Sequence, residues 1–413
     1  MRQAEALKAG ADPVERARSM LRRQWRPVVL PAIALWTVAA IAAGTLVSSF
    51  DIQEYARYAH AALQAPLFHR LPLEYPAPAV GVFLLPLLLP IAYPWAFAVF
   101  VGVVLVALLM TYDTPGLPGL DVEGAGRLIA YLALGGVMFF TARYDLFAMA
   151  AMFWSYRAAR RDRWSAAWAW SAVGFALKLF PAVMWPVLLI AEWRETRRVP
   201  ARRLLWMAGS GALLVGLPAL LNHKAAVNVA HYYLHRPTET GSVAAGLSVL
   251  ADWSHLAFVV TFHSLNVLSA ASGPISTVLE VAGAVGCAAV WWLYARGRLT
   301  MEAAVLASLT CVVLGSKVLS VQYVMWLMPF WALYRVRPAW ALACVLNTVV
   351  FPFSSWLVSY AHATLHAYGI SLTLTYFARD LLIAAGTLAW LREALDEPIR
   401  APVEGGGLAV GTA

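Results

Sequence analysis

Long apolar runs alternate with short polar stretches along nearly the whole chain. Many of these runs reach about 18 residues, close to the roughly 20 that an α-helix needs to cross a bilayer. The pattern predicts an all-α polytopic membrane protein with about 12 transmembrane helices in one domain over residues 27–392. Residues 128–142 form a run too short for a full crossing, so we expect short re-entrant or interfacial helices on the extracytoplasmic side.

Basic clusters predict which ends of the spans face the cytoplasm. Arginine and lysine concentrate in cytoplasmic loops of membrane proteins, so the clusters orient the chain. They are "RRQWR" (22–26), "RAARRDR" (157–163), "EWRETRRVPARR" (192–203), "RGR" (296–298), "RVR" (335–337) and Arg392 with Arg400. This arrangement predicts two cytoplasmic termini: a segment over residues 1–26 without a removable signal peptide, and a disordered tail over residues 393–413.

The opposite ends of the spans carry nearly all the other polar residues. On this assignment they are the first loop 49–76, the turns 112–124, 142–145, 178–181 and 315–323, and the loop 222–246. A site that used these residues would face outward, at the extracytoplasmic side of the cell membrane. The net charge of +9 then reflects orientation and predicts no nucleic-acid partner.

The composition excludes several kinds of site. Only 13% of the residues are charged, against about 25% in a soluble domain. The three cysteines lie far apart inside apolar segments, which is typical of buried residues and not of a disulfide framework or a zinc site. The outer loops contain no D-x-D pair, and the chain has no glycine-rich nucleotide loop, so we expect neither a metal nor a cofactor.

Asp51 lies where the first apolar run ends, in the stretch "SSFDIQEYARYAH" (48–60). A carboxylate at the outer end of a span is well placed to act as a general base. Glu54 and Tyr55 follow one helical turn later and can share its face. The alternative is that Asp51 only caps the helix that follows, because aspartate is a favoured N-cap residue.

Lys178 lies between apolar runs in "VGFALKLFPAVMWPVLL" (173–189). Placing an ammonium at membrane depth costs free energy, so a lysine there suggests a function. Here the proposed function is to bind a lipid phosphate. The alternative is a lysine that extends to the membrane interface. Pro181, three residues later, favours a turn at this point.

Further charges lie at or near the same predicted level. Lys317 begins a second outer turn, in "GSKVLSVQYVMWLMP" (315–329), and several basic residues at one face suggest an anionic substrate. Arg379 and Asp380 are sequence neighbours on a predicted helix, so we expect them to point apart and not to pair. The remaining candidates are Arg143, Asp145, Arg236, Gln322 and Tyr323.

Several segments together resemble a known enzyme family. "DIQEY" (51–55), "LEYPAPAVGVFLLPLLL" (73–89), the block from "ARYD" to "KLFP" (142–181), "HRPTETGSVAAG" (235–246) and "KVLSVQYVMWLMP" (317–329) carry the resemblance. They are similar to the D-x-x-x-Y, YPP, R-[FY]-D, K-L-[FY]-P and later blocks of polyprenyl-phosphate-mannose-dependent mannosyltransferases. These are the integral-membrane enzymes of glycosyltransferase family 87, within the GT-C superfamily.

The resemblance implies a GT-C-type fold and an inverting, metal-independent transfer of a sugar, expected to be mannose, from a polyprenyl-phosphate donor to a glycolipid or polysaccharide acceptor. Asp51 matches the catalytic aspartate of the first loop. Gln322 occupies the place where some members carry a histidine that assists the acceptor. The candidate residues suit this reaction, because displacing a sugar from phosphate needs cations at the phosphate and a base at the acceptor hydroxyl.

The candidate residues take the following roles on this interpretation. Asp51 is the catalytic base, and Lys178 holds the donor phosphate with Lys317 or Arg379. The residues expected to shape the sugar or acceptor pocket are Glu54, Tyr55, Arg143, Asp145, Arg236, Gln322 and Tyr323.

Two other functions remain open from the sequence. A lipid or glycolipid transporter or flippase would also need polar groups among the spans. A translocation path needs them at the midplane and on both faces, whereas here they gather on one side. A non-catalytic scaffold of the cell envelope would leave Lys178 and Lys317 without a role.

Overall fold

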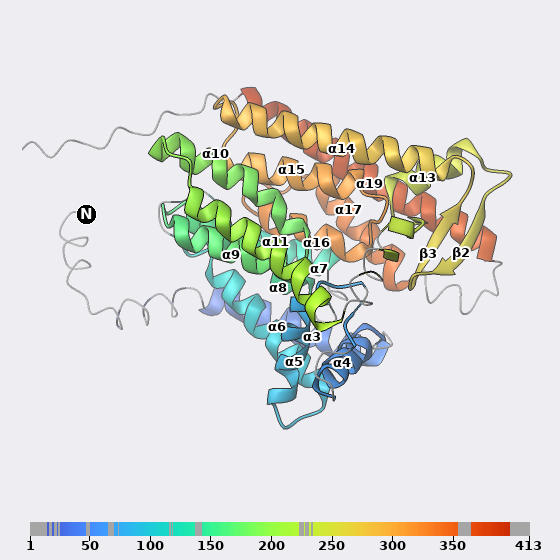
Figure 1. Ribbon diagram of the computed structural model, residues 1–413, viewed down its shortest axis with the longest axis horizontal. Helices are drawn as coiled ribbons and strands as arrows, with labels where there is room; N and C mark the ends of the chain where they lie inside the picture. Colours follow the sequence, from blue (N-terminus) through green and yellow to red (C-terminus); the bar gives the residue numbers. More distant parts are fainter. Residues whose placement is uncertain are drawn as a thin grey trace, which may run out of the picture.

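The computed structural model describes residues 25–46, 50–64, 70–72, 74–114, 119–136, 143–222, 234–353 and 365–396, with a few isolated positions between them. Almost all of the predicted cytoplasmic segment 1–26 and residues 397–413 of the predicted tail lie outside these ranges. Where it is described, the chain is a bundle of helices with one small sheet at its edge (Figure 1).

The first half of the bundle consists of α3 (Leu30–Leu46), α4 (Phe50–Leu63), α5 (Val80–Leu84), α6 (Tyr93–Met110), α7 (Val122–Gly135), α8 (Asp145–Ala159), α9 (Trp164–Leu177), α10 (Met184–Thr196) and α11 (Ala201–Leu221). The second half consists of α13 (Val243–Ala251), α14 (Ser272–Ala295), α15 (Met301–Gly315), α16 (Val324–Trp331), α17 (Pro338–Thr348) and α19 (Leu365–Asp396). Short helical turns η1 (Trp25–Val29), η2 (Ala77–Ala79), η3 (Leu85–Leu88), η4 (Phe180–Val183), η5 (Val321–Tyr323) and η6 (Val349–Phe353) join them.

Four described helices are long and apolar enough to cross a membrane by themselves: α6, α11, α14 and α19. Their presence supports a helical membrane protein, while the number of crossings and their orientation stay predictions. Residues 128–142, expected to form a half-helix, contribute to α7, which begins earlier, at Val122, and ends at Gly135. The last six residues of that run lie outside the described ranges.

α8 defines the two ends of the bundle. It begins at Asp145, which pairs with Lys178, and it ends at Ala159, next to the arginines of 157–163. We call the first the cavity end and the second the arginine end. Arg160 pairs with Glu302 at the start of α15 with an N–O distance of 3.2 Å, so other helices also meet at the arginine end.

Residues 77–92 stay at the cavity end and do not cross the bundle. Pro78 and Pro86 stand in this segment, which forms only the short pieces η2, α5 and η3, because proline cannot donate the hydrogen bond that a continuous helix requires. The hydroxyl of Tyr93, at the start of α6, donates to the carbonyl of Phe83 in α5 at 2.7 Å. α6 therefore begins where α5 lies and makes the next passage alone.

This arrangement corrects the predicted position of the turn 112–124. The sequence analysis placed it on the face opposite to 157–163, but Arg157 Nε donates to Thr114 Oγ1 at 2.8 Å, so both lie at the arginine end. Gly119 has a φ of +75°, and a Cβ there would meet the carbonyl oxygen of Leu333 at 2.4 Å, so the turn packs closely beside "RVR". Residues 77–92 do not cross the bundle, so α6 is the passage that brings this turn to the arginine end.

The all-α expectation is also incomplete, because the chain contains a three-stranded antiparallel sheet of order β1-β3-β2. Its strands are β1 (Thr238–Glu239), β2 (Ala257–Thr261) and β3 (Ser264–Leu268). Thr261 pairs with Ser264, so only two residues join β2 to β3. The sheet lies at one side of the bundle, where Phe258 of β2 packs against His366 at the start of α19 (Figure 1).

Candidate active site

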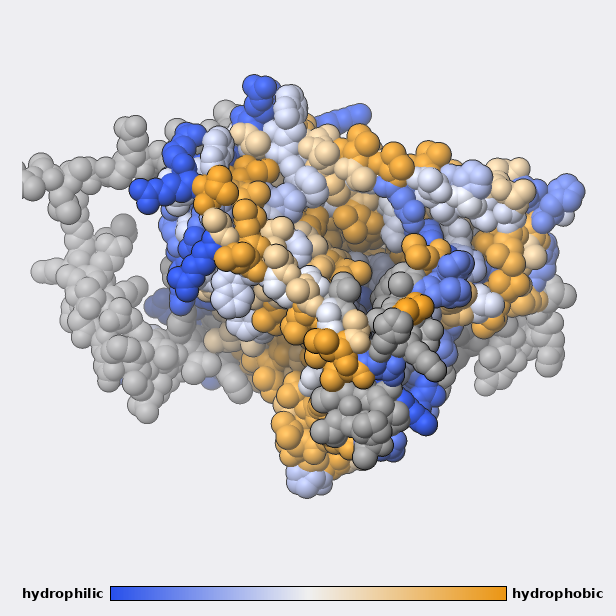
Figure 2. Space-filling model, in the orientation of Figure 1, coloured by the Kyte–Doolittle hydropathy of each residue, from blue (hydrophilic) through white to orange (hydrophobic). Residues whose placement is uncertain are grey.

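A large cavity opens at the cavity end of the bundle, with a volume of about 1220 Å³. Its charged part is formed by α4, the turn between α9 and η4, the β2–β3 hairpin and residues 316–323. Its apolar part lies between α14 and α15 and includes Ala284, Cys287, Trp291 and Val313. The surface is hollowed between α14 and α11, and much of the rim is hydrophobic (Figure 2).

Asp51 and Arg143 form an ion pair on the cavity wall. Asp51 stands in the first turn of α4, where a negative charge is favoured by the helix dipole. Its side chain is 24% exposed, so one part of the carboxylate binds Arg143 and another part faces the cavity. Both residues were predicted site residues, and the structure brings them together from segments about 90 positions apart.

Lys178 and Asp145 form the second ion pair, with Nζ 2.6 Å from Oδ1. Lys178 ends α9 in extended backbone conformation, which turns its side chain into the cavity. The Asp145 carboxylate is 1% exposed and also accepts a hydrogen bond from Trp326 Nε1 at 2.9 Å. Burial lowers the pKa of Lys178, and the negative charge of Asp145 opposes this effect.

Aromatic rings surround the Lys178 ammonium and fix its position. Nζ lies 5.2 Å from the ring centroid of Tyr144, 5.3 Å from that of Tyr323 and 5.4 Å from that of Trp326. Each distance is within the range of a cation–π contact. Lys178 is therefore a preorganised cation at the cavity wall, not a lysine that extends to solvent.

The two other α4 residues proposed for the pocket differ in position. Glu54 lines the cavity and pairs with the exposed Arg57. Tyr55 is fully buried, and its ring stacks on Phe83 with centroids 4.5 Å apart. It does not line the cavity, so its predicted role as a sugar contact is wrong and its contribution is to core packing.

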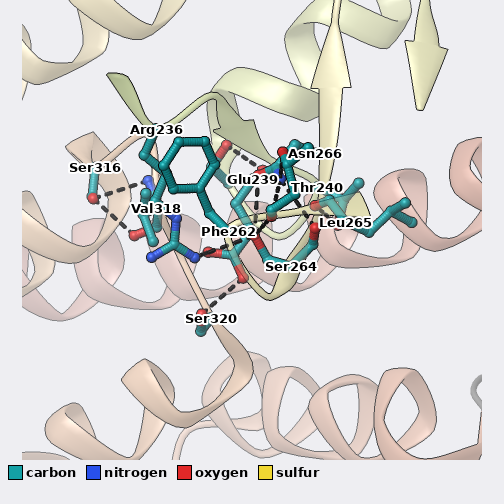
Figure 3. Close-up of polar contacts among 12 residues, drawn as sticks. Arg236, Glu239, Thr240, Phe262, Ser264, Leu265, Asn266, Ser316, Val318 and Ser320 are labelled. Carbon is teal, nitrogen blue, oxygen red and sulfur yellow. Dashed lines mark hydrogen bonds and ion pairs between the residues drawn. The ribbon is translucent and has the colours of Figure 1, made fainter. Parts of the chain in front are cut away.

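Arg236, Glu239 and Ser320 form a polar group on another wall of the cavity (Figure 3). Arg236 Nη2 lies 3.3 Å from Glu239 Oε2, and Ser320 Oγ donates to Glu239 Oε1 at 2.8 Å. The Glu239 amide also donates to the carbonyl of Lys317 at 3.0 Å. These bonds fasten the β-sheet to the turn that carries Lys317.

Lys317 is the predicted cation whose side chain remains available. It is half-buried and lines the cavity, and its ammonium has no ion-pair partner among the described residues. Gln322 and Tyr323 line the same wall, and Gln322 Oε1 is buried without a hydrogen-bond partner in the described part of the chain. A buried oxygen without a partner and a cation without an ion pair, both on the wall of one cavity in the described part of the chain, indicate a place for a ligand.

Arg379 does not line the cavity, and the expectation that it stays apart from Asp380 is wrong. It is fully buried in α19, and its Nε donates to Asp380 Oδ1 at 2.9 Å. Its other nitrogens donate to Asn347 Oδ1 and to the carbonyl of Gly241, each at 2.9 Å. A long, flexible arginine side chain can bend back to its neighbour, which the helical geometry of the backbone alone does not reveal. The guanidinium joins α17, α19 and residue 241, and has no face left for a donor phosphate.

The sequence analysis missed the residues at the tip of the β2–β3 hairpin. Phe262 and His263 form its two-residue turn with φ of 53° and 56°, and both line the cavity. Such a turn favours glycine or asparagine, because other side chains are strained at positive φ. The Tyr232 hydroxyl donates to the Phe262 carbonyl at 3.3 Å and its ring packs against the Phe262 ring. Backbone strain retained at a cavity wall is a mark of function.

Two acidic residues of the wall were also missed, Glu74 and Glu280. Tyr58 donates its hydroxyl to Glu74 Oε2 at 3.0 Å. Glu280 is a carboxylate within α14, a helix long and apolar enough to cross a membrane, so the rule that singled out Lys178 would have found it. Among the described residues, no three His, Cys, Asp or Glu side chains are placed to hold a metal ion.

The arrangement provides the parts of a group transfer to or from an anion. Asp51 is an accessible carboxylate held by a cation, Lys178 and Lys317 carry positive charge, and the strained hairpin forms a further wall. The cavity continues along α14 from Glu280 to Trp291, about 16 Å at the rise of an α-helix. One ligand could thus place a polar part among the charges and an apolar part between the helices.

Comparison with known proteins agrees with this chemistry. A search of curated proteins found no match. The model of glycosyltransferase family 87 matches residues 73–321, which is more than half of the chain. Lys178 and Lys317 lie within the matched range, whereas Asp51 and Arg379 lie outside it. The chain therefore belongs to glycosyltransferase family 87, a GT-C-type membrane family, and is a membrane glycosyltransferase.

Proposed function

We propose that the protein transfers mannose from a polyprenyl-phosphate donor to a hydroxyl of a glycolipid or polysaccharide acceptor. The observation that carries this proposal is that one cavity combines a charged part, which contains Lys178 and Lys317, with an apolar part between α14 and α15. A polyprenyl-phosphate sugar has the same two halves, a hydroxyl-rich anionic head and a long hydrocarbon tail. A water-soluble nucleotide sugar would leave the apolar half without a partner.

The donor phosphate is proposed to lie against Lys317, with Lys178 as the second cation. Lys317 can bind an anion without breaking an ion pair, whereas Lys178 remains bound to Asp145. Positive charge at the phosphate stabilises the charge that develops as the bond to the sugar breaks. The isoprenoid is proposed to run along α14 toward Trp291.

Asp51 is proposed to be the base. Its carboxylate removes the proton from the acceptor hydroxyl, the hydroxyl oxygen attacks the anomeric carbon, and the phosphate leaves with the bonding electrons of the broken C–O bond. One displacement inverts the anomeric configuration. Arg143 holds the Asp51 carboxylate in place on the cavity wall through their ion pair.

The acceptor is proposed to approach along the hairpin wall. Phe262 and His263 offer a flat apolar ring and a hydrogen-bonding ring at the opening, and Gln322 offers an unpartnered amide oxygen. The site is proposed to face the extracytoplasmic side, and the arginine bias at the other end of the bundle supports this orientation.

The test is a transfer assay with purified protein, using extracted lipids as acceptors. Polyprenyl-phosphate-mannose is expected to support transfer in the presence of EDTA, whereas GDP-mannose is not. Product formed only from GDP-mannose, or only with added divalent metal, would contradict the proposed donor and mechanism. Polyprenyl-phosphate-glucose in a parallel reaction tests the choice of sugar.

A further inference from the structure

A second cavity, of about 430 Å³, lies at the arginine end of the bundle, away from the candidate active site. The ends of α6 and α8, the start of α9 and the turn 160–163 form its walls. Its principal side chains are Thr111, Trp154, Arg157, Arg161, Arg163 and Trp170. Hydrophilic residues gather on this end of the bundle, near the start of α9 and the end of α10 (Figure 2).

Three arginines give this cavity a positive charge. Arg157, Arg161 and Arg163 line it, and none of them forms an ion pair with a carboxylate in the described part of the chain. Arg157 donates from Nε to Thr114 Oγ1, which holds the guanidinium in place and leaves its other nitrogens available. Arg160 turns to Glu302 and does not line the cavity.

Acidic groups near this cavity compensate only part of the charge. Asp113 interacts electrostatically with Arg157 from the end of α6, without a direct ion pair. Asp162 lies in the same turn as the arginines, is exposed and does not line the cavity. A ligand that binds here therefore meets three guanidinium groups and no carboxylate on the wall.

The start of α9 adds a second source of positive potential. α9 begins at Trp164, and Arg163 at its N-cap position makes no side-chain hydrogen bond to the first amides. Ala166, in this first turn, lines the cavity. Unpaired amides and the helix dipole make the N-terminus of a helix favourable for an anion.

The cavity lies at the level where lipid headgroups are expected. α6 is long and apolar enough to cross a membrane, and Met110, its last residue, lines the cavity. Trp154 and Trp170 pack edge to face with centroids 4.8 Å apart, and Trp170 is 39% exposed. Tryptophan is enriched at the interface between hydrocarbon and headgroups.

We propose that this cavity binds the phosphate group of an anionic phospholipid, with Arg157, Arg161 and Arg163 at the phosphate and Trp170 against the glycerol and upper acyl chains. Basic pockets between transmembrane helices suit such headgroups. A lipid is favoured over a free phosphate because the exposed tryptophan and the end of α6 provide an apolar wall that inorganic phosphate would not use. This site is separate from the sugar-transfer site and does not depend on it.

The test measures lipid affinity of the purified full-length protein by native mass spectrometry. The probes are dioleoylphosphatidylglycerol, dioleoylphosphatidylcholine and inorganic phosphate. The variant is Arg161→Ala with Arg163→Ala, and the control is Arg198→Ala with Arg202→Ala. The control removes two exposed arginines at the same end of the bundle that do not line the cavity.

Each basic residue near an anionic headgroup strengthens binding about fivefold, so the double variant is expected to bind phosphatidylglycerol roughly 25-fold more weakly. The control is expected to match the unmodified protein, and phosphatidylcholine affinity is expected not to change. If the double variant fails to fold, Arg161→Gln alone is expected to weaken binding about fivefold. Equal phosphatidylglycerol affinity in variant and control would overturn the proposal. Binding of inorganic phosphate without phosphatidylglycerol binding would overturn its lipid identity.

Discussion

Replacing Lys317 by alanine should weaken the use of the donor and leave the fold intact. The Lys317 side chain lines the cavity and has no ion-pair partner among the described residues. Its removal therefore leaves no carboxylate without a partner. The substitution therefore affects ligand binding and breaks no buried ion pair. Substitution of the other cation, Lys178, would break its ion pair with Asp145.

The magnitude follows from these contacts. A hydrogen bond to a charged group contributes about 1.5–3 kcal/mol, so kcat/KM for the donor should fall roughly 10- to 150-fold. Substitution of a half-exposed side chain that has no structural partner typically changes the free energy of unfolding by less than about 0.5 kcal/mol. Lys317→Arg keeps the charge and should retain most of the activity, whereas Lys317→Gln keeps the length without the charge and should resemble alanine.

The assay measures initial rates over a range of donor concentrations, with the thermal unfolding midpoint of the same preparations in detergent. A folded Lys317→Ala protein whose kcat/KM for the donor equals that of the unmodified protein would refute the reasoning. An equal loss in the alanine and arginine variants would show that side-chain shape, and not charge, is what the site requires.

Three further predictions concern the neighbouring groups. Lys178→Ala leaves the buried Asp145 carboxylate without its cation, so the free energy of unfolding should fall by about 3–5 kcal/mol. Adding Asp145→Asn to this variant should restore part of the lost stability. If the losses of the two single variants simply add in the double variant, the two residues do not interact as a pair. Arg379→Ala should lower the unfolding midpoint without changing the donor KM of the folded fraction, and a raised donor KM would return Arg379 to the phosphate site. Phe262→Asn with His263→Gly suits the hairpin turn better, so the midpoint should hold or rise while kcat/KM for the acceptor falls; unchanged acceptor kinetics would limit the turn to a structural role.

Hydrophobic length and isolated charges predicted much of this protein. Lys178, a single lysine between apolar runs, does lie on the cavity wall, as does Asp51 at the end of the first run. Both signals work because an ionised group at membrane depth needs a partner or a function. Glu280 follows the same rule and was overlooked inside a long apolar run, although the carboxylate is visible in the sequence.

Other features depend on packing that periodicity does not encode. Residues 77–92 are apolar enough to suggest a crossing, but their prolines divide them into short pieces, and this reverses the face of the turn that follows. Tyr55 shares a helix with Asp51 but turns into an aromatic cluster with Phe83. The hairpin at 262–263 lacks the glycine or asparagine that usually signals such a turn, so its strain became visible only in the backbone angles.

The central claim is that Asp51 is the base of a sugar transfer, and Asp51→Asn tests it most directly. Asparagine keeps the size of the side chain and an oxygen that can accept from Arg143, but it cannot take a proton. The turnover of polyprenyl-phosphate-mannose should therefore fall by roughly 10²- to 10⁴-fold, while the unfolding midpoint of the same preparation changes little. Near-normal turnover at an unchanged midpoint would contradict the account and make Glu54, one helical turn further on the cavity wall, the next residue to test.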